Sequence, residues 1–471
     1  MNNRSNLSKK TKTLFGIGTY GYSSLNQTLS SFIMFFGISI IKIRPFLVGI
    51  AIAISTFWDG VSDPIVGFIS DNHKSKFFGK RHGFLLFATF GIVITNILIW
   101  NIPSSLSEAS KFFILVILML LIETFNTFFS TPYGALAIDL SEFDTNHNSI
   151  QVFRTIFYIL ALITPNVLMM IFMKPTPEFP NGQLNPESYK NISYITSILT
   201  VVCAIIMIIG TINKGRESYK LTENNPKEKF NFVNLFKGFF SVFAKRDFRN
   251  VIMGYSVAIM STSFLSGLGM HLFTYTFHLS TIQIPFVLGF LFLSAMISQP
   301  FWNYISVKKS KVKAIKYALL TAMIGVVLLA ISLKLNQIYD NVYLFLCITF
   351  FISGFGTGAL YCLPFALYSD IVLEDKNKTG IDKTATYNAY MTMAFKIANA
   401  LTLLVNGILL SLIKFDADKP VQPLSVQRSL GVIVLVGVSF SVLTAYSIFN
   451  NFENNRKVSG LFFKKLKKVK K

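Results

Sequence analysis

Long apolar segments alternate with short polar loops along most of the chain. A helix of about 20 apolar residues is long enough to cross the hydrocarbon core of a bilayer. Each of the following segments meets that length or comes close to it: residues 14–40, 45–70, 83–101, 112–138, 150–173, 191–213, 250–277, 282–305, 314–333, 341–369, 385–413 and 428–450. The pattern therefore predicts an all-α membrane protein with about twelve transmembrane helices.

The largest polar break in this pattern divides the chain into two halves. It carries Gly215, Pro226 and many charged residues, which is typical of a linker. We therefore predict an N-terminal six-helix bundle, a cytoplasmic linker, a C-terminal six-helix bundle and a basic cytoplasmic tail, at residues 1–213, 214–250, 251–450 and 451–471. Two six-helix halves are the layout of transporters that are built from repeated halves.

The charges of the chain support this class and set its orientation. Only 14% of the 471 residues are charged, against about 25% in soluble proteins. The formal net charge is +22, and 33 of the 44 Lys and Arg fall on one side of the predicted helices, against nine in the opposite loops. The positive-inside rule then places both termini in the cytoplasm. Because the basic charge lines one membrane face, its partner is the lipid bilayer and we expect no nucleic acid.

Enzyme chemistry finds no support in the sequence. It contains no Gly-x-Ser-x-Gly, no His-x-x-x-x-Asp and no His-Cys metal cluster, and the three cysteines lie in apolar segments. We therefore expect a protein that is not an enzyme and has no cofactor. The expected location is the plasma membrane (the inner membrane of a bacterium), which the chain crosses several times, and the expected state is a monomer.

Two carboxylates inside the second apolar segment are the first candidates for chemistry. A charge in a membrane helix costs roughly 2.5–3.5 kcal/mol on insertion scales. Asp59 and Asp63 are four residues apart and share a helix face, with Ser62 beside them. Two carboxylates this close require either protonation of one of them or a cation between them. The pair predicts a site for a coupling cation; the alternative is a structural ion pair with a basic residue of another helix.

A charged cluster follows this pair at the cytoplasmic end of the same segment. Asp71 ends the helix, and Lys80 and Arg81 lie in the basic loop after it. Such a cluster predicts an inside gate, and its alternative is charge that only sets the topology. Asp370, after Pro364 in the second half, is a further gating candidate.

These residues resemble a known family. The pattern Asp59-x-x-x-Asp63-Pro64-x-x-Gly67-x-x-x-Asp71, followed by Gly79-Lys80-Arg81, is similar to the signature of the glycoside–pentoside–hexuronide:cation symporters of the major facilitator superfamily. The resemblance covers nearly the whole chain and implies the major facilitator fold. It also implies that Asp59 and Asp63 bind Na⁺, or H⁺ or Li⁺, and that Thr127 supplies an oxygen ligand.

The resemblance also points to substrate-binding positions, several of which depart from the pattern of sugar carriers. Arg154, Thr392 and Lys396 match positions near the substrate or the cation. Other positions lack the residues of the sugar-transporting members: a Lys-Asp pair is replaced by Tyr22 and Ser23, an Asp by Ser130, and a stacking aromatic residue by Gly134.

Two further polar residues are candidates from their own positions. Glu123 shares a helix face with Thr127 and Ser130, so it is a candidate replacement for the missing acid, or else a partner of a neighbouring helix. Asn26 is a buried amide that lines the cavity or bonds another helix.

The expected function is cation-coupled symport of a small organic solute, a sugar or sugar derivative, by alternating access. The departures keep two alternatives open. One is a sodium-coupled carrier of lipids or lysolipids with the same fold. The other is a membrane scaffold or sensor that no longer transports.

Overall fold

The computed structural model describes residues 7–469 apart from 74, 76, 142–148, 223–239, 340, 380–383 and 420. Within its helices, some side chains are also outside the description: those of 71–72, 138, 141, 149, 151–152, 218–222, 376, 379, 384–386, 388–389 and 455–469. The described chain is helical throughout, without strands, and eleven of its helical spans are long and apolar enough to cross a membrane. The first helix, α1 (Lys9–Phe35), is a further long helix that is richer in small and hydroxyl residues. The expected all-α membrane fold is confirmed.

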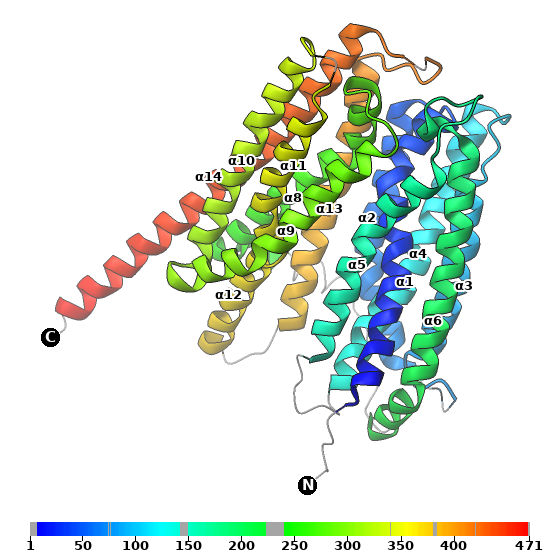
Figure 1. Ribbon diagram of the computed structural model, residues 1–471. Helices are drawn as coiled ribbons and strands as arrows, with labels where there is room; N and C mark the ends of the chain where they lie inside the picture. Colours follow the sequence, from blue (N-terminus) through cyan, green and yellow to red (C-terminus); the bar gives the residue numbers. More distant parts are fainter. Residues whose placement is uncertain are drawn as a thin grey trace. The chain divides into compact units, whose positions relative to one another are not determined.

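The chain forms two compact units. Unit 1 comprises Met1–Phe230, Ser280–Pro285 and Leu404–Val421. Its remaining helices are α2 (Pro45–Asn72), α3 (His82–Trp100), α4 (Glu108–Ser141), α5 (Ser149–Phe172) and α6 (Pro186–Thr222). Helix α1 packs against α5 and α6, and α4 packs against α2 and α3 (Figure 1). The α2–α4 pair therefore brings the predicted cation residues of both helices onto facing surfaces.

Glycines allow α1 to approach its neighbours closely. A Cβ atom added at Gly16 would lie 2.3 Å from Phe157 of α5, and one at Gly21 would lie 2.5 Å from Cys203 of α6. Larger residues at these positions would push the helices apart, which is the usual role of small residues at helix interfaces in membranes.

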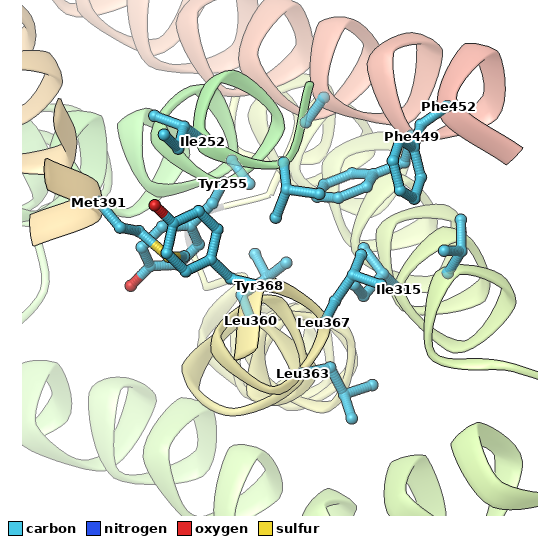
Figure 2. Close-up of a cluster of buried hydrophobic side chains, with 14 of the residues drawn as sticks. Ile252, Tyr255, Ile315, Leu360, Leu363, Leu367, Tyr368, Met391, Phe449 and Phe452 are labelled. Carbon is cyan, nitrogen blue, oxygen red and sulfur yellow. The ribbon is translucent and has the colours of Figure 1, made fainter. Parts of the chain in front are cut away.

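Unit 2 comprises Asn231–Leu279, Phe286–Leu403 and Gln422–Lys471. Its helices are α8 (Arg246–His271), most of α9 (Gln283–Lys308), α10 (Lys311–Leu335), α11 (Tyr343–Gly358), α12 (Leu363–Thr379), most of α13 (Thr384–Leu412) and α14 (Leu424–Val469). Its core holds Tyr255 of α8, Ile315 of α10, Tyr368 of α12, Met391 of α13 and Phe449 of α14 (Figure 2). One apolar cluster thus joins five helices of this unit.

The segment that the sequence predicts as one helix over 341–369 is broken in the structure. Helix α11 ends at Gly358, a 3₁₀ turn occupies Ala359–Tyr361, and α12 starts at Leu363. The break has a local cause, because Pro364 has no N–H to donate to the carbonyl of Leu360 and so interrupts the helical hydrogen bonds.

The first helix of each half ends in the same way, 236 residues apart. Helix α1 continues into a π-helical turn, Phe36–Ile40, and α8 continues into another, Leu272–Thr276. Both turns are followed by a residue with positive φ, Lys42 at 57° and His278 at 51°. The closing hydrogen bonds correspond as well, since Ile41 N–H donates to Phe36 and Phe277 N–H donates to Leu272. This repetition is what two related halves would produce.

Candidate cation and substrate site

Asp59 and Asp63 lie one turn apart on α2, opposite two threonines of α4. The Thr127 hydroxyl oxygen lies 3.1 Å from Asp59 Oδ1, and the Thr131 hydroxyl oxygen lies 3.3 Å from Asp63 Oδ1. Both carboxylates are half-buried. The structure thus brings together the two acids and Thr127, as expected, and adds Thr131, which sequence reasoning missed. Its signal was its spacing of four residues after Thr127, which repeats the spacing of the two acids.

The two hydroxyl groups near Asp59 make more contacts with oxygen atoms than they have hydrogens to donate. Ser62 Oγ and Thr127 Oγ1 are both buried and lie 2.8 Å apart. Ser62 Oγ is also 3.2 Å from the Asp59 carbonyl oxygen, and Thr127 Oγ1 is 3.0 Å from the Glu123 carbonyl oxygen. With the Asp59 carboxylate, two hydroxyl hydrogens serve four oxygen–oxygen contacts, because each hydroxyl has only one hydrogen to donate.

At most two of these contacts can therefore be full hydrogen bonds, and the others share a hydrogen or bring oxygen lone pairs together. A cation or an additional proton between the oxygens would stabilise such an arrangement. Carboxylate, hydroxyl and carbonyl oxygens are the ligands that hard cations prefer. The donor set at Asp59, Ser62 and Thr127 thus suits a small hard cation such as Na⁺.

Tyr22 of α1 lies beside this pair. Its ring stacks on Phe129 of α4 with the ring centroids 4.7 Å apart, and its hydroxyl is hydrogen-bonded with Ser130. The charges of Asp59, Asp63 and Glu123 all act on this hydroxyl. Two positions that depart from the sugar-carrier pattern, Tyr22 and Ser130, are therefore direct partners.

Gly134, one turn beyond Ser130, borders open space. A Cβ atom built at this position meets no other atom within 4 Å. On α1, Ser23 is buried, and Asn26 is half-buried one turn after Tyr22. The residues of α1 and α4 that we expect at the substrate thus lie on neighbouring turns of their helices.

Arg154 of α5 lies against an aromatic ring of α4. Its guanidinium carbon is 5.8 Å from the centroid of Tyr133, and the Tyr133 hydroxyl bonds the hydroxyl of Thr19 on α1 at 2.7 Å. Arg154 is therefore held by a cation–π contact. In unit 2, Thr392 and Lys396 are half-buried, one turn apart on α13. Their place in a substrate site stays a prediction.

The predicted gating residues have the following places. Arg81 is buried; its guanidinium donates to Ser70 Oγ at 2.8 Å and lies 3.4 Å from Asp139 Oδ2 at the end of α4. Lys80 is half-buried, and the side chain of Asp71 lies outside the described residues. The sequence does not predict the Arg81–Asp139 pair, because nothing in it shows that the end of α4 meets the loop after α2.

In unit 2 the predicted gating residue Asp370 pairs with Lys311, with both carboxylate oxygens 2.8 Å from Nζ. Lys311 begins α10, and Asp370 lies in α12 after Pro364, as Asp139 lies in α4 after Pro132. Each unit thus has a basic residue paired with an acid that follows a helix proline. A gating role for these pairs stays a prediction.

A helical membrane chain in two units that repeat one helix end is typical of transporters built from repeated halves. Solved structures have the same fold: a bacterial homologue of the iron transporter ferroportin in its inward-facing state aligns with a TM-score of 0.63 at 14% identity, covering 95% of this chain and 99% of that one. The nucleoside transporter NupG aligns with a TM-score of 0.62 at 12% identity, covering 94% and 99%.

The chain belongs to the family described as MFS/sugar transport protein, whose model matches residues 14–452. It is similar to the sodium-dependent lysophosphatidylcholine symporter 1 of Xenopus tropicalis, with 22% identity over 94% of this chain and 87% of that protein. It is also similar to the uncharacterized symporter YnaJ of Bacillus subtilis (strain 168), with 23% identity over 95% of this chain and 94% of that protein. The protein is therefore a multi-pass membrane protein of the major facilitator superfamily.

Proposed function

We propose that this protein couples the entry of Na⁺ to the transport of a lysophospholipid-like amphiphile. The observation that carries the Na⁺ part is the shortage of hydrogens around Asp59, Ser62 and Thr127. A bound Na⁺ would take these surplus oxygens as ligands. The sodium-dependent relatives support the same coupling ion. Asp63, held near Thr131, completes the proposed ion site.

The proposed cargo follows from the residues on α1 and α4. Recognition of a sugar relies on several hydrogen-bonding groups beside an aromatic platform. Here Tyr22 bonds Ser130 and stacks on Phe129, and Gly134 leaves open space. An aromatic surface beside open space suits an alkyl chain better than a ring of hydroxyls. The lysophosphatidylcholine symporters among the relatives support this cargo.

A sugar remains the second candidate, because the description of the matching family names sugar transport. In either case we place the chain near the glycoside–pentoside–hexuronide:cation symporters. We also propose that it works as a monomer in the plasma membrane and that Ser23, Asn26, Arg154, Thr392 and Lys396 contribute to cargo binding.

A ligand panel on the purified protein tests this proposal. Unfolding temperature is measured with lysophosphatidylcholine below its micellar concentration, with a free fatty acid and with a galactoside, each in NaCl and in choline chloride. A ligand at 100 times its dissociation constant stabilises the native state by about 2.7 kcal/mol, which corresponds to a rise of roughly 3–8 °C. We expect this rise for lysophosphatidylcholine in NaCl alone.

The other outcomes of the panel are equally clear. A rise with the galactoside alone would replace the amphiphile by a sugar. Equal rises in NaCl and choline chloride would contradict Na⁺ coupling. A folded protein that responds to no ligand and to no ion would support the scaffold or sensor alternative.

A further inference from the structure

The turn between α9 and α10 is rich in lysine. Its basic residues between positions 308 and 316 are Lys308, Lys309, Lys311, Lys313 and Lys316. The apolar span of α9 ends at Lys308 and that of α10 begins at Lys311, so this turn lies at the membrane surface. It also lies near the end of α14, where Lys316 bonds Glu453 at 2.9 Å. The sequence predicts that end of the chain to be cytoplasmic, which places the turn on the cytoplasmic side.

Ion pairs compensate part of this charge. Lys311 and Lys316 each pair with an acid of another helix. Among the residues that the structure describes, Lys308, Lys309 and Lys313 have no acidic partner within ion-pair distance. Lys308 and Lys309 are exposed, and Lys313 is half-buried. The turn therefore presents a net positive surface, which attracts an anionic partner.

Two exposed tyrosines accompany these lysines. Lys308 Nζ donates to the Tyr304 hydroxyl at 3.1 Å and lies 5.4 Å from the centroid of its ring. Lys309 Nζ lies 3.4 Å from the Tyr317 hydroxyl and 4.7 Å from that ring centroid, and Lys313 is one turn before Tyr317 on α10. A phenol is neutral, so these contacts orient the ammonium groups without cancelling their charge. Each hydroxyl that accepts from a lysine keeps its own hydrogen to donate to a ligand.

Exposed apolar side chains continue from both tyrosines into the membrane spans. On α9 they precede Tyr304 by three and seven residues, and on α10 they follow Tyr317 by the same spacings, so each row keeps to one helix face. These side chains are Phe301, Ile297, Leu320 and Ile324. The surface thus changes from apolar through aromatic to cationic toward the cytoplasm. A phospholipid changes in the same order from its acyl chains to its headgroup.

We propose that the α9–α10 turn binds the headgroup of an anionic phospholipid of the cytoplasmic leaflet. The ammonium groups of Lys308, Lys309 and Lys313 contact its phosphate, and the two tyrosine hydroxyls donate to its oxygens. A headgroup with net negative charge is favoured, because a choline group would add positive charge to the same surface. The site lies in unit 2 and shares no residue with the proposed ion site at Asp59, so it does not depend on the proposed transport function.

Equilibrium binding of fluorescent dioleoylphosphatidylglycerol to the purified full chain in a nonionic detergent tests this site. The double variant Lys308→Gln/Lys309→Gln should raise the dissociation constant of this probe by about tenfold or more, because each lysine near an anionic surface contributes about fivefold. Its unfolding temperature in detergent alone should match wild type, because both lysines are exposed. Unlabelled phosphatidylglycerol should displace the probe about tenfold better than phosphatidylcholine does.

Lys9→Gln/Lys10→Gln is the matched control. It also removes two adjacent exposed lysines at the start of a helix, on the side that the sequence predicts to be cytoplasmic, but in unit 1. It should leave the dissociation constant of the probe unchanged.

Three results would overturn the proposal. Equal losses of affinity in the two double variants, or no loss in Lys308→Gln/Lys309→Gln, would exclude a site at this turn. Equal displacement of the probe by phosphatidylcholine and phosphatidylglycerol would exclude selection for an anionic headgroup. Displacement by inorganic phosphate at the same concentration as phosphatidylglycerol would replace the lipid by a free anion.

Discussion

Thr127 Oγ1 lies 3.1 Å from Asp59 Oδ1 and 3.0 Å from the carbonyl oxygen of Glu123. A threonine in a helix commonly donates its hydrogen to the carbonyl four residues earlier. When Thr127 does so, it turns a lone pair toward the Asp59 carboxylate. The two helices then face each other through oxygens that attract a cation, which is why we place the coupling ion between α2 and α4.

Replacing Thr127 by Val should weaken Na⁺ binding without unfolding the protein. Val keeps the shape of the side chain but removes the oxygen, and loss of a ligand-shell group typically costs 10- to 100-fold in metal affinity. We expect the Na⁺ dissociation constant to rise by about tenfold or more, measured by Na⁺-dependent stabilisation. Thr321→Val is the control, because the Thr321 hydroxyl donates to the carbonyl of Tyr317 in its own helix. An unchanged constant for Thr127→Val would exclude it as a ligand.

Gly134 and Gly354 should respond oppositely to the same substitution. A Cβ atom at Gly134 enters open space, whereas one at Gly354 would lie 2.1 Å from the carbonyl oxygen of Leu291 on α9. Gly134→Ala should therefore keep or raise stability by up to about 1 kcal/mol, and Gly354→Ala should lose at least about 2 kcal/mol. Thermal unfolding measures both changes.

A larger side chain at Gly134 probes the cargo site. We expect Gly134→Trp to fold and to bind Na⁺ like wild type, because a side chain at this position starts into open space. It should raise the dissociation constant of the cargo by about tenfold or more, which corresponds to a loss of about 1.4 kcal/mol or more of binding free energy. Equal cargo affinity in Gly134→Trp and wild type would remove this space from the cargo site.

Asp139→Asn tests the acidic partner of the buried Arg81. The Arg81 side chain is only 8% exposed, so weakening its ion pair leaves a charge with less compensation in a dry environment. We expect a loss of about 1–3 kcal/mol of stability. Glu187→Gln, at an exposed pair with Lys190, should change stability by less than about 0.5 kcal/mol. Equal losses in the two variants would contradict a structural role for Asp139.

The sequence predicts the helices closely, because long apolar segments have few other ways to satisfy their backbone in a bilayer. The expected segment 45–70 corresponds to α2, Pro45–Asn72, and 83–101 corresponds to α3, His82–Trp100. Local irregularities were not predictable from hydropathy. The π turns after α1 and α8 and the break before α12 change the hydrogen bonding of a few residues and leave the apolar pattern intact.

The sequence likewise predicts some residues of the candidate site and not others. Asp59 and Asp63 stand out in the sequence because a charge in an apolar segment is costly. Thr131 does not stand out, because it is an ordinary residue of a membrane helix until the partner helix is known. The Tyr22–Ser130 hydrogen bond likewise joins positions 108 residues apart, and no pattern along the chain predicts it.

Uptake into proteoliposomes tests Na⁺ coupling through Asp59 most directly. Wild type, Asp59→Asn and the control Asp418→Asn, an exposed position, are supplied with labelled lysophosphatidylcholine, and albumin removes the lipid left outside. An inward Na⁺ gradient should raise uptake by wild type and Asp418→Asn about tenfold or more over a choline gradient, and should have no effect on Asp59→Asn. Uptake by Asp59→Asn that still follows the Na⁺ gradient would contradict the account.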